Sequence, residues 1–138
     1  INGIMKIFTG LDVINYDYFS IQSIVKTIIN SIIKHEPKSG GCNIYDYVYV
    51  LSKGIKINYR HQECDNKLRE IYKRILTYQQ SDGGFSYSRE HSQKKIYLRN
   101  IPNAPNVGDI HGTTLYCMAM WIIDKSCNLN LNLNTIIS

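Results

Sequence analysis

The chain has 138 residues, enough for one domain with a real core and too few for two comfortable ones. Its net charge of +5 would permit an anionic partner, but the basic residues are scattered except within residues 89–99, so nucleic acid is not favoured. A helical apolar pattern begins at once after Ile1. We therefore expect the C-terminal part of a larger protein whose N-terminal repeats lie upstream.

The cysteine content and the hydropathy of the chain predict its cellular compartment. The four cysteines are too few and too widely spaced for a small disulfide scaffold, and no signal-like segment precedes them: Cys42, Cys64, Cys117 and Cys127. We read them as reduced thiols of a cytoplasmic protein. The longest apolar run, residues 115–123, is about half of what a bilayer-spanning helix needs, so we expect no transmembrane segment.

The first half of the chain predicts two amphipathic helices and a buried one. Apolar residues at three-and-four spacing mark a short helix over residues 4–11 and a longer one over residues 21–33, with Ser20 as its expected N-cap. The second helix should end before Pro37. Residues 44–51 continue as a helix that is apolar on most sides, which is typical of a buried helix.

The second half repeats this order. Residues 68–76 form an amphipathic stripe with a charged face, and residues 109–123 are apolar nearly all round, which predicts another buried helix. In the tail, residues 126–138, Asn and Leu alternate with period two, and we assign this low-complexity segment no role. The helical unit is expected over residues 1–125.

This order is an internal repeat. A unit made of an amphipathic helix, a Gly-Gly turn and a buried helix occurs twice along the chain. Gly40-Gly41-Cys42 matches Gly83-Gly84-Phe85. Such a chain predicts an all-α fold of antiparallel helical hairpins, in an open solenoid or in a closed ring.

The stretch "QQSDGGFSY", residues 79–87, carries the chemistry of a sharp turn. Glycine reaches positive φ without steric penalty and aspartate caps nearby amides, so Asp82, Gly83 and Gly84 predict a structural joint in preference to a catalytic loop. Phe85 should then pack back as a wedge between neighbouring hairpins.

These residues resemble a known family, the α/α-toroid repeat proteins that include protein prenyltransferase β subunits and squalene- or terpene-type cyclases. "QQSDGGFSY" looks like the Gln-x-x-Asp-Gly-Gly-aromatic repeat, and "GDIHGTTLYCMAMWII" resembles the start of an inner toroid helix. The resemblance covers residues 20–124. It implies an incomplete ring whose inner helices surround a cavity for an isoprenoid or polycyclic substrate.

Aromatic residues of the inner helices would line that cavity and stabilise developing carbocations. The candidates for substrate binding are Tyr45, Tyr49, Tyr116 and Trp121. The alternative is that these side chains belong to the hydrophobic core.

Asp109 and His111, at the start of the last helix, are the catalytic candidates, because the carboxylate of Asp109 could orient the imidazole of His111. The alternative is an N-terminal cap in which Asp109 accepts helix amides. Family transferases bind zinc through Asp, Cys and His, but Asp109-Ile110-His111-Gly112-Thr113 is one residue shorter than the family motif, and no Asp-x-Cys pair occurs. No metal ligand set is therefore predicted, and the cofactor stays open.

The basic loop of residues 89–99 is longer than a hairpin needs, which favours a lid that meets an anionic ligand through Lys94, Lys95 and Arg99. A solvated loop is the alternative. Three functions remain: a transferase or cyclase whose site is completed upstream, a toroid or helical-repeat module that binds without catalysing, and, third, a nucleic-acid binder with salt-dependent affinity.

Overall fold

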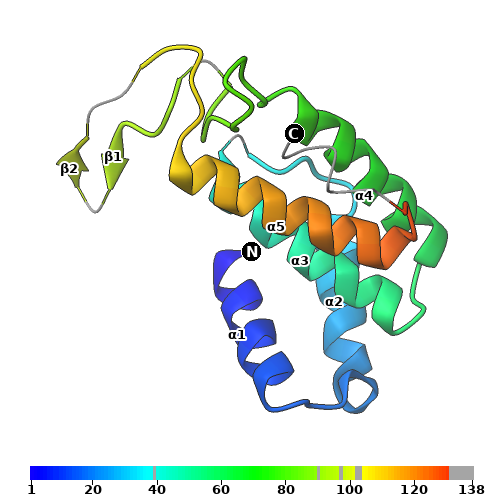
Figure 1. Ribbon diagram of the computed structural model, residues 1–138. Helices are drawn as coiled ribbons and strands as arrows, with labels where there is room; N and C mark the ends of the chain where they lie inside the picture. The colour runs from blue at the N-terminus through cyan, green and yellow to red at the C-terminus, as the bar shows by residue number, and fades with distance from the viewer. Residues whose placement is uncertain (39, 90, 97, 102–103, 131–138) are drawn as a thin grey trace.

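The computed structural model describes residues 1–38, 40–89, 91–96, 98–101 and 104–130. Five α-helices dominate it (Figure 1): α1 Asn2–Val13, α2 Gln22–Ile32, α3 Gly41–Lys56, α4 His61–Leu76 and α5 Ile110–Cys127. A 3₁₀ helix, Tyr18–Ile21, leads into α2, and two short strands, β1 Lys95–Ile96 and β2 Arg99–Asn100, pair antiparallel between α4 and α5. The predicted all-α fold is confirmed, while the ring arrangement stays a prediction.

Helix α3 is the centre of the fold because it packs against each of the other four α-helices. Its buried side chains meet those of α4 and α5 in one hydrophobic core, which includes Ile44, Val48, Leu51, Leu68 and Ile123. The buried helix predicted for residues 44–51 is therefore confirmed, and α3 extends it in both directions.

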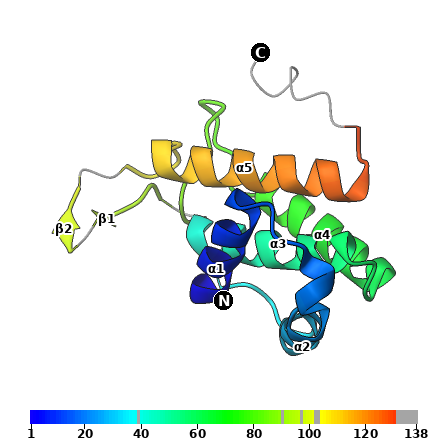
Figure 2. The ribbon, with the colours of Figure 1, turned by 90° about the horizontal axis from the view of Figure 1, so that it is seen from below.

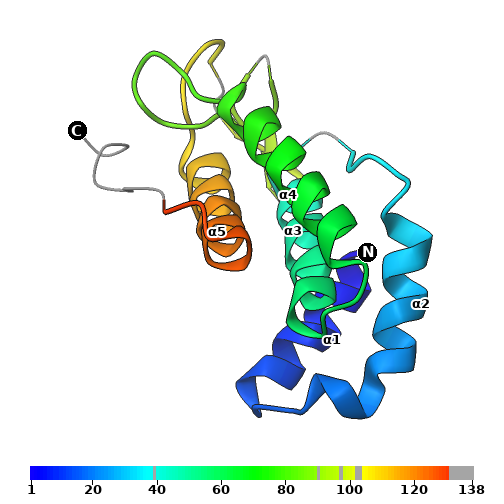
Figure 3. The same cartoon turned by 90° about the vertical axis from the view of Figure 1, so that its right-hand side faces the viewer.

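The helices run in two opposite directions. Asp12 at the end of α1 pairs with Lys53 near the end of α3, while the backbone of Tyr87 bonds to the first turn of α3 and to the N-cap of α5, so α1, α3 and α5 run parallel. Helices α2 and α4 run the other way, and Figure 3 shows α3 between α5 on one side and α2 on the other. Each of α2 and α4 thus runs antiparallel to the helix that follows it.

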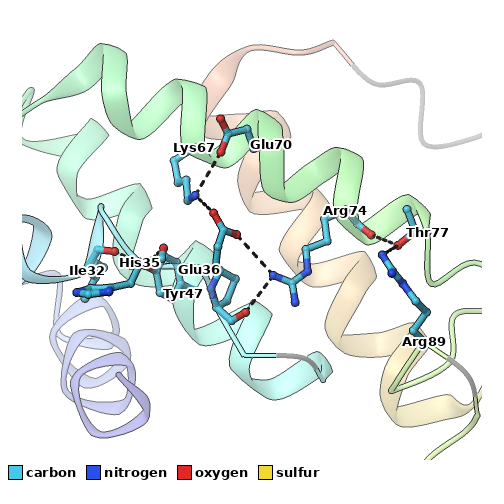
Figure 4. A network of polar contacts seen from close by, with 10 residues as sticks. Ile32, His35, Glu36, Tyr47, Lys67, Glu70, Arg74, Thr77 and Arg89 are labelled. Atoms are coloured by element: carbon cyan, nitrogen blue, oxygen red, sulfur yellow. Dashed lines mark hydrogen bonds and ion pairs between the residues drawn. The ribbon is translucent and has the colours of Figure 1, made fainter.

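A polar network ties the α2–α3 connection to α4 (Figure 4). Glu36 bridges Lys67 and Arg74, and the Arg74 guanidinium also donates to the Pro37 carbonyl at 3.0 Å. On the other side of this connection the Tyr47 hydroxyl donates to the carbonyls of Ile32 and His35. The segment is fixed from both sides, and α2 ends before Pro37 as the sequence predicts.

The predicted cap at Ser20 is wrong. Ser20 lies inside the 3₁₀ helix, whose N-cap is Asp17: its carboxylate accepts the Phe19 amide at 3.0 Å and the Ser20 hydroxyl at 3.1 Å. An aspartate three residues upstream takes over the role because the chain tightens into a 3₁₀ turn before α2 begins.

The expectation that the last helix is buried all round is also wrong. Helix α5 buries Tyr116, Ala119, Met120 and Ile123, but Met118 is 44% exposed and Trp121 is 54% exposed. Its second apolar face is therefore open in this structure.

Between α4 and α5 the chain makes the predicted turn and then a long loop. The β1–β2 hairpin of this loop projects away from the helices (Figures 1 and 2). Helix α5 continues through Ser126 and Cys127, so the predicted tail begins inside a helix, and residues 131–138 lie outside the described part of the chain. Among the described residues, no helix has the length and apolar character needed to cross a bilayer.

Candidate functional site

A pocket of about 780 Å³ lies between α1, α3 and α5. It is bounded by Asp12 at the end of α1, by one face of α3 and by the open face of α5. The lining residues are Asp12, Tyr45, Tyr49, Ser52, Lys53, Lys56, Cys117, Met118, Trp121, Ile122, Lys125 and Ser126. The volume is in the range of pockets that hold small organic ligands.

Three of the four predicted substrate-binding aromatics line this pocket. Tyr45 and Tyr49 are one turn apart on α3, with ring centroids 6.0 Å apart, and Trp121 faces the pocket from α5. Tyr116 lies elsewhere: it is fully buried, its ring centroid is 4.9 Å from that of Tyr78, and its hydroxyl donates to the Tyr87 carbonyl at 3.1 Å. Tyr116 therefore belongs to the core and does not line the pocket.

Ionic groups gather where α1 and α3 end. The Lys53 ammonium pairs with the Asp12 carboxylate at 2.5 Å, Lys56 lies 3.6 Å from the same group, and the Tyr49 hydroxyl donates to it. Burial by itself would raise the pKa of Asp12, but the hydrogen bonds from Lys53 and Tyr49 bring it below its ordinary value. Burial lowers the pKa of Lys53, and its contact with Asp12 opposes that shift.

The lysines also lie over aromatic rings. The Lys53 nitrogen is 4.3 Å from the centroid of Tyr49, and the Lys56 nitrogen is 4.5 Å from that of Tyr18. Such contacts hold an ammonium group in place by attraction to the ring face. With Lys125, the lining holds three lysines against one carboxylate, so this end of the pocket carries net positive charge.

This charged end of the pocket was not predicted from the sequence. Lys53 lies half a turn beyond the last residue of the apolar stripe of α3. A lysine so close to a buried stripe indicates a buried ion pair. Asp12 carries no comparable signal, because its contact with Lys53 spans 41 residues of sequence.

Asp109 occupies the N-cap of α5, and its carboxylate accepts three backbone amides. The donors are Gly112 at 2.6 Å, Tyr87 at 2.7 Å and Gln93 at 3.1 Å. The first of these bonds is the expected cap, and the other two hold the preceding loop against the helix.

The His111 imidazole contacts other groups than Asp109. Its Nδ1 lies 2.6 Å from Oε1 of Gln93, its Nε2 lies 3.8 Å from Sγ of Cys42, and its ring stacks on Tyr87 with centroids 5.2 Å apart. The structure thus brings Cys42 and His111 together and places Gln93 where we had expected the carboxylate of Asp109. Gln93 was not among the predicted site residues, because it lies in a polar loop without a recognisable pattern.

The predicted turn is built around Asp82. One carboxylate oxygen accepts the Gly84 amide at 3.0 Å and the other accepts the Gly108 amide at 2.9 Å, while Gly83 has a φ of +85° that favours glycine. Phe85 is buried, and its ring centroid lies 5.8 Å from that of Tyr116. This joint thereby fixes the loop against the start of α5.

The three basic residues assigned to a lid lie away from the pocket. Lys94, Lys95 and Arg99 are exposed on and beside the β1–β2 hairpin, and none lines the pocket. Residues 90 and 97 of this loop lie outside the described part of the chain. A role for the three residues as ligand contacts stays a prediction, which requires the hairpin to move.

The residues of this chain do not form the zinc site of the prenyltransferases that its repeat motif resembles. Within the described ranges, no group of three or more His, Cys, Asp or Glu side chains is placed to hold a metal ion. Cys42 and His111 approach each other, but the Asp109 carboxylate is bound to amides and Cys117 lies on the pocket instead.

Comparisons of this chain with protein-family models, with curated proteins and with solved structures found no match. The family resemblance of the repeat motif therefore stays a prediction.

Proposed function

We propose that this chain is part of a helical-repeat protein of the α/α-toroid type that binds an isoprenoid or polycyclic ligand with an anionic head group. The observation that carries the proposal is the division of the pocket lining. Most of the lining surface is apolar, and its charged groups are three lysines and one carboxylate. A ligand with an apolar body and a diphosphate or comparable anionic group would match both the apolar and the charged part of the lining.

The helix order supports the repeat architecture. Parallel inner helices α1, α3 and α5 alternate in sequence with α2 and α4, as a toroid of helical hairpins requires. In such a protein the open face of α5 and the pocket would face the centre of the ring, and upstream repeats of the same chain would cover more of the ligand. A cytoplasmic location belongs to this proposal, and all four cysteines are free thiols.

Two forms of the proposal share the pocket and differ in the fate of the ligand. In a transferase or cyclase, the protein with its upstream repeats converts the ligand. In a binding module, the ligand is released unchanged. The geometry supports the shared step, which is binding, and incubation followed by product analysis separates the two forms.

The test of binding uses Trp121, the one tryptophan of the chain, which lies on the pocket. We expect farnesyl diphosphate to change the tryptophan emission of the full chain in a saturable manner. Farnesol and inorganic diphosphate should each bind more weakly, since each supplies one half of the match. If farnesyl diphosphate leaves the emission unchanged at millimolar concentration, the proposal is wrong.

A charge-reversal pair locates the head group. Lys125→Glu changes a lysine that lines the pocket, whereas Lys73→Glu changes an exposed lysine of α4 outside it. We expect Lys125→Glu to weaken binding about tenfold or more, which corresponds to about 1.4 kcal/mol, and Lys73→Glu to leave it unchanged. Equal losses in the two variants would mean that binding depends on net charge and not on the pocket.

A further inference from the structure

The first turns of α3 and α5 bring a thiol, an imidazole and a carboxamide together from distant parts of the sequence. Cys42 is the second residue of α3, His111 is the second residue of α5, and Gln93 comes from the loop that precedes α5. The distances are 3.8 Å from Sγ of Cys42 to Nε2 of His111 and 2.6 Å from Nδ1 of His111 to Oε1 of Gln93. A nucleophile, a base and a group that orients the base stand in this order in cysteine-dependent acyl transfer.

The hydrogen bonds of Gln93 fix the tautomer of the imidazole. Its Nε2 donates to the Lys95 carbonyl at 2.8 Å, which turns Oε1 toward His111, and its backbone amide is held by Asp109 at 3.1 Å. Because an amide oxygen only accepts, Nδ1 of His111 carries the proton. The lone pair of Nε2 therefore faces the thiol of Cys42.

Tyr87 holds the imidazole of His111 from one side. Its ring stacks on the imidazole with an interplanar angle of 23°. Burial raises the pKa of Tyr87 to about 12, so its phenol is protonated at neutral pH. Stacking also limits rotation of the imidazole.

The four cysteines differ in ways that single out Cys42. Cys64 and Cys127 are buried, and burial raises the pKa of their thiols to about 11 and about 12. Cys117 is exposed on α5, where desolvation also raises the pKa of its thiol. Cys42 is half-buried, and it is the cysteine whose sulfur approaches an imidazole nitrogen.

We propose that Cys42 is a nucleophile that accepts an acyl group from an activated ester or thioester, with His111 as its base and Gln93 as a positioning residue. The sulfur forms a bond with the acyl carbon while Nε2 of His111 takes the thiol proton. The bond from that carbon to the leaving oxygen or sulfur then breaks, and the leaving group departs with the proton from Nε2. Water, deprotonated by the same nitrogen, afterwards hydrolyses the enzyme thioester and restores the thiol.

The primary test mixes the full chain with p-nitrophenyl acetate. We expect a burst of about one equivalent of p-nitrophenolate and, by peptide mass mapping, the acetyl group on Cys42. Cys42→Ser should abolish the burst, and His111→Ala should slow it about a hundredfold, the range of a lost general base. His61→Ala, at an exposed histidine on the first residue of α4, should leave the burst unchanged.

Two further measurements separate chemistry from a structural role. Added imidazole should restore at least part of the burst rate in His111→Ala, and failure to do so would overturn His111 as the base. Gln93→Glu keeps an acceptor oxygen for Nδ1 and should stay within about threefold of the wild-type rate, while Gln93→Leu should fall about tenfold. Both Gln93 variants slowing equally would overturn its positioning role.

If His111→Ala does not fold, the wild-type protein still decides the central point. Cys42 should acetylate at least tenfold faster than the more exposed Cys117 in the same sample. Equal acetylation of the two cysteines would overturn the proposal.

Discussion

At the scale of single residues, Gly112 shows how closely the loop lies against α5. A β-carbon at this position would lie 2.5 Å from the Tyr87 nitrogen, 2.8 Å from the Phe85 oxygen and 2.8 Å from the Ser86 carbonyl carbon. All three are backbone atoms, so the clash cannot be relieved by a change of rotamer. The glycine of "DIHGT" is thereby explained by packing.

We predict that Gly112→Ala lowers the free energy of unfolding by about 2 kcal/mol. The matched control is Gly10→Ala in the interior of α1, where a β-carbon would meet nothing within 4 Å. There alanine should raise the free energy of unfolding by about 0.5–1 kcal/mol, because glycine has the lower helix propensity. Urea unfolding of both variants measures the two values, and equal changes would contradict the close approach at Gly112.

Asp46 is a buried carboxyl group on α3 whose pKa is raised by burial; a hydrogen bond from Asn2 and the charge of Lys6 oppose the shift. A raised pKa means that the folded protein binds this proton more tightly than the unfolded chain does. The wild-type protein should therefore lose stability as the pH rises above 3.8, the ordinary value, through the folded pKa. We predict that Asp46→Asn gains stability relative to wild type over that same interval.

Asp12 provides a control, because the shift of its pKa has the opposite sign to that of Asp46. Its pKa is lowered in the folded protein, so its contribution to stability is present above 3.8 and is lost as the pH falls through the folded pKa. Asp12→Asn should therefore be less stable than wild type at pH 7, and the difference should shrink as the pH falls. Urea unfolding from pH 3 to pH 7 tests both, and slopes of the same sign for the two variants would contradict the assignment.

At the scale of helices, a glycine of α3 lies close against a cysteine of α4. A β-carbon on Gly54 would lie 2.7 Å from Sγ of Cys64, which is buried on α4. Helix packing at this crossing depends on the absence of one side-chain atom.

A double-mutant cycle tests this crossing. Gly54→Ala should lower the free energy of unfolding in the wild-type background, but not in a Cys64→Ala background, where the sulfur is gone. The expected coupling between the two positions is about 1–3 kcal/mol. Additive effects of the two substitutions would show that the helices move apart without cost.

The positions of the helices could be predicted from the sequence, but their covered faces could not. Apolar spacing located all five, because that pattern is a local property of each helix. It could not tell which apolar face of α5 would be covered: the stripe with Tyr116, Ala119 and Ile123 meets α3 and α4, while Met118 and Trp121 face the pocket. That choice depends on neighbours that a single helix does not encode.

At the scale of the whole molecule, the candidate sites were partly predictable. Tyr45, Tyr49 and Trp121 were predicted to line a common cavity, and they line the pocket between α3 and α5. The partners of the charged and reactive groups did not follow. Asp12 meets Lys53 across 41 residues and Cys42 meets His111 across 69, and such pairings depend on how the helices dock.

The long separation between Cys42 and His111 also bears on the order of folding. Helices α3 and α4 are joined by residues 57–60 alone, whereas α5 reaches α3 only after the whole chain between them has folded back. Closing the longer loop costs more chain entropy, and contacts distant in sequence form more slowly than local ones. The α3–α4 hairpin therefore has the kinetic advantage over the docking of α5. Because the pair of thiol and imidazole exists only after that docking, its appearance during refolding marks the arrival of α5.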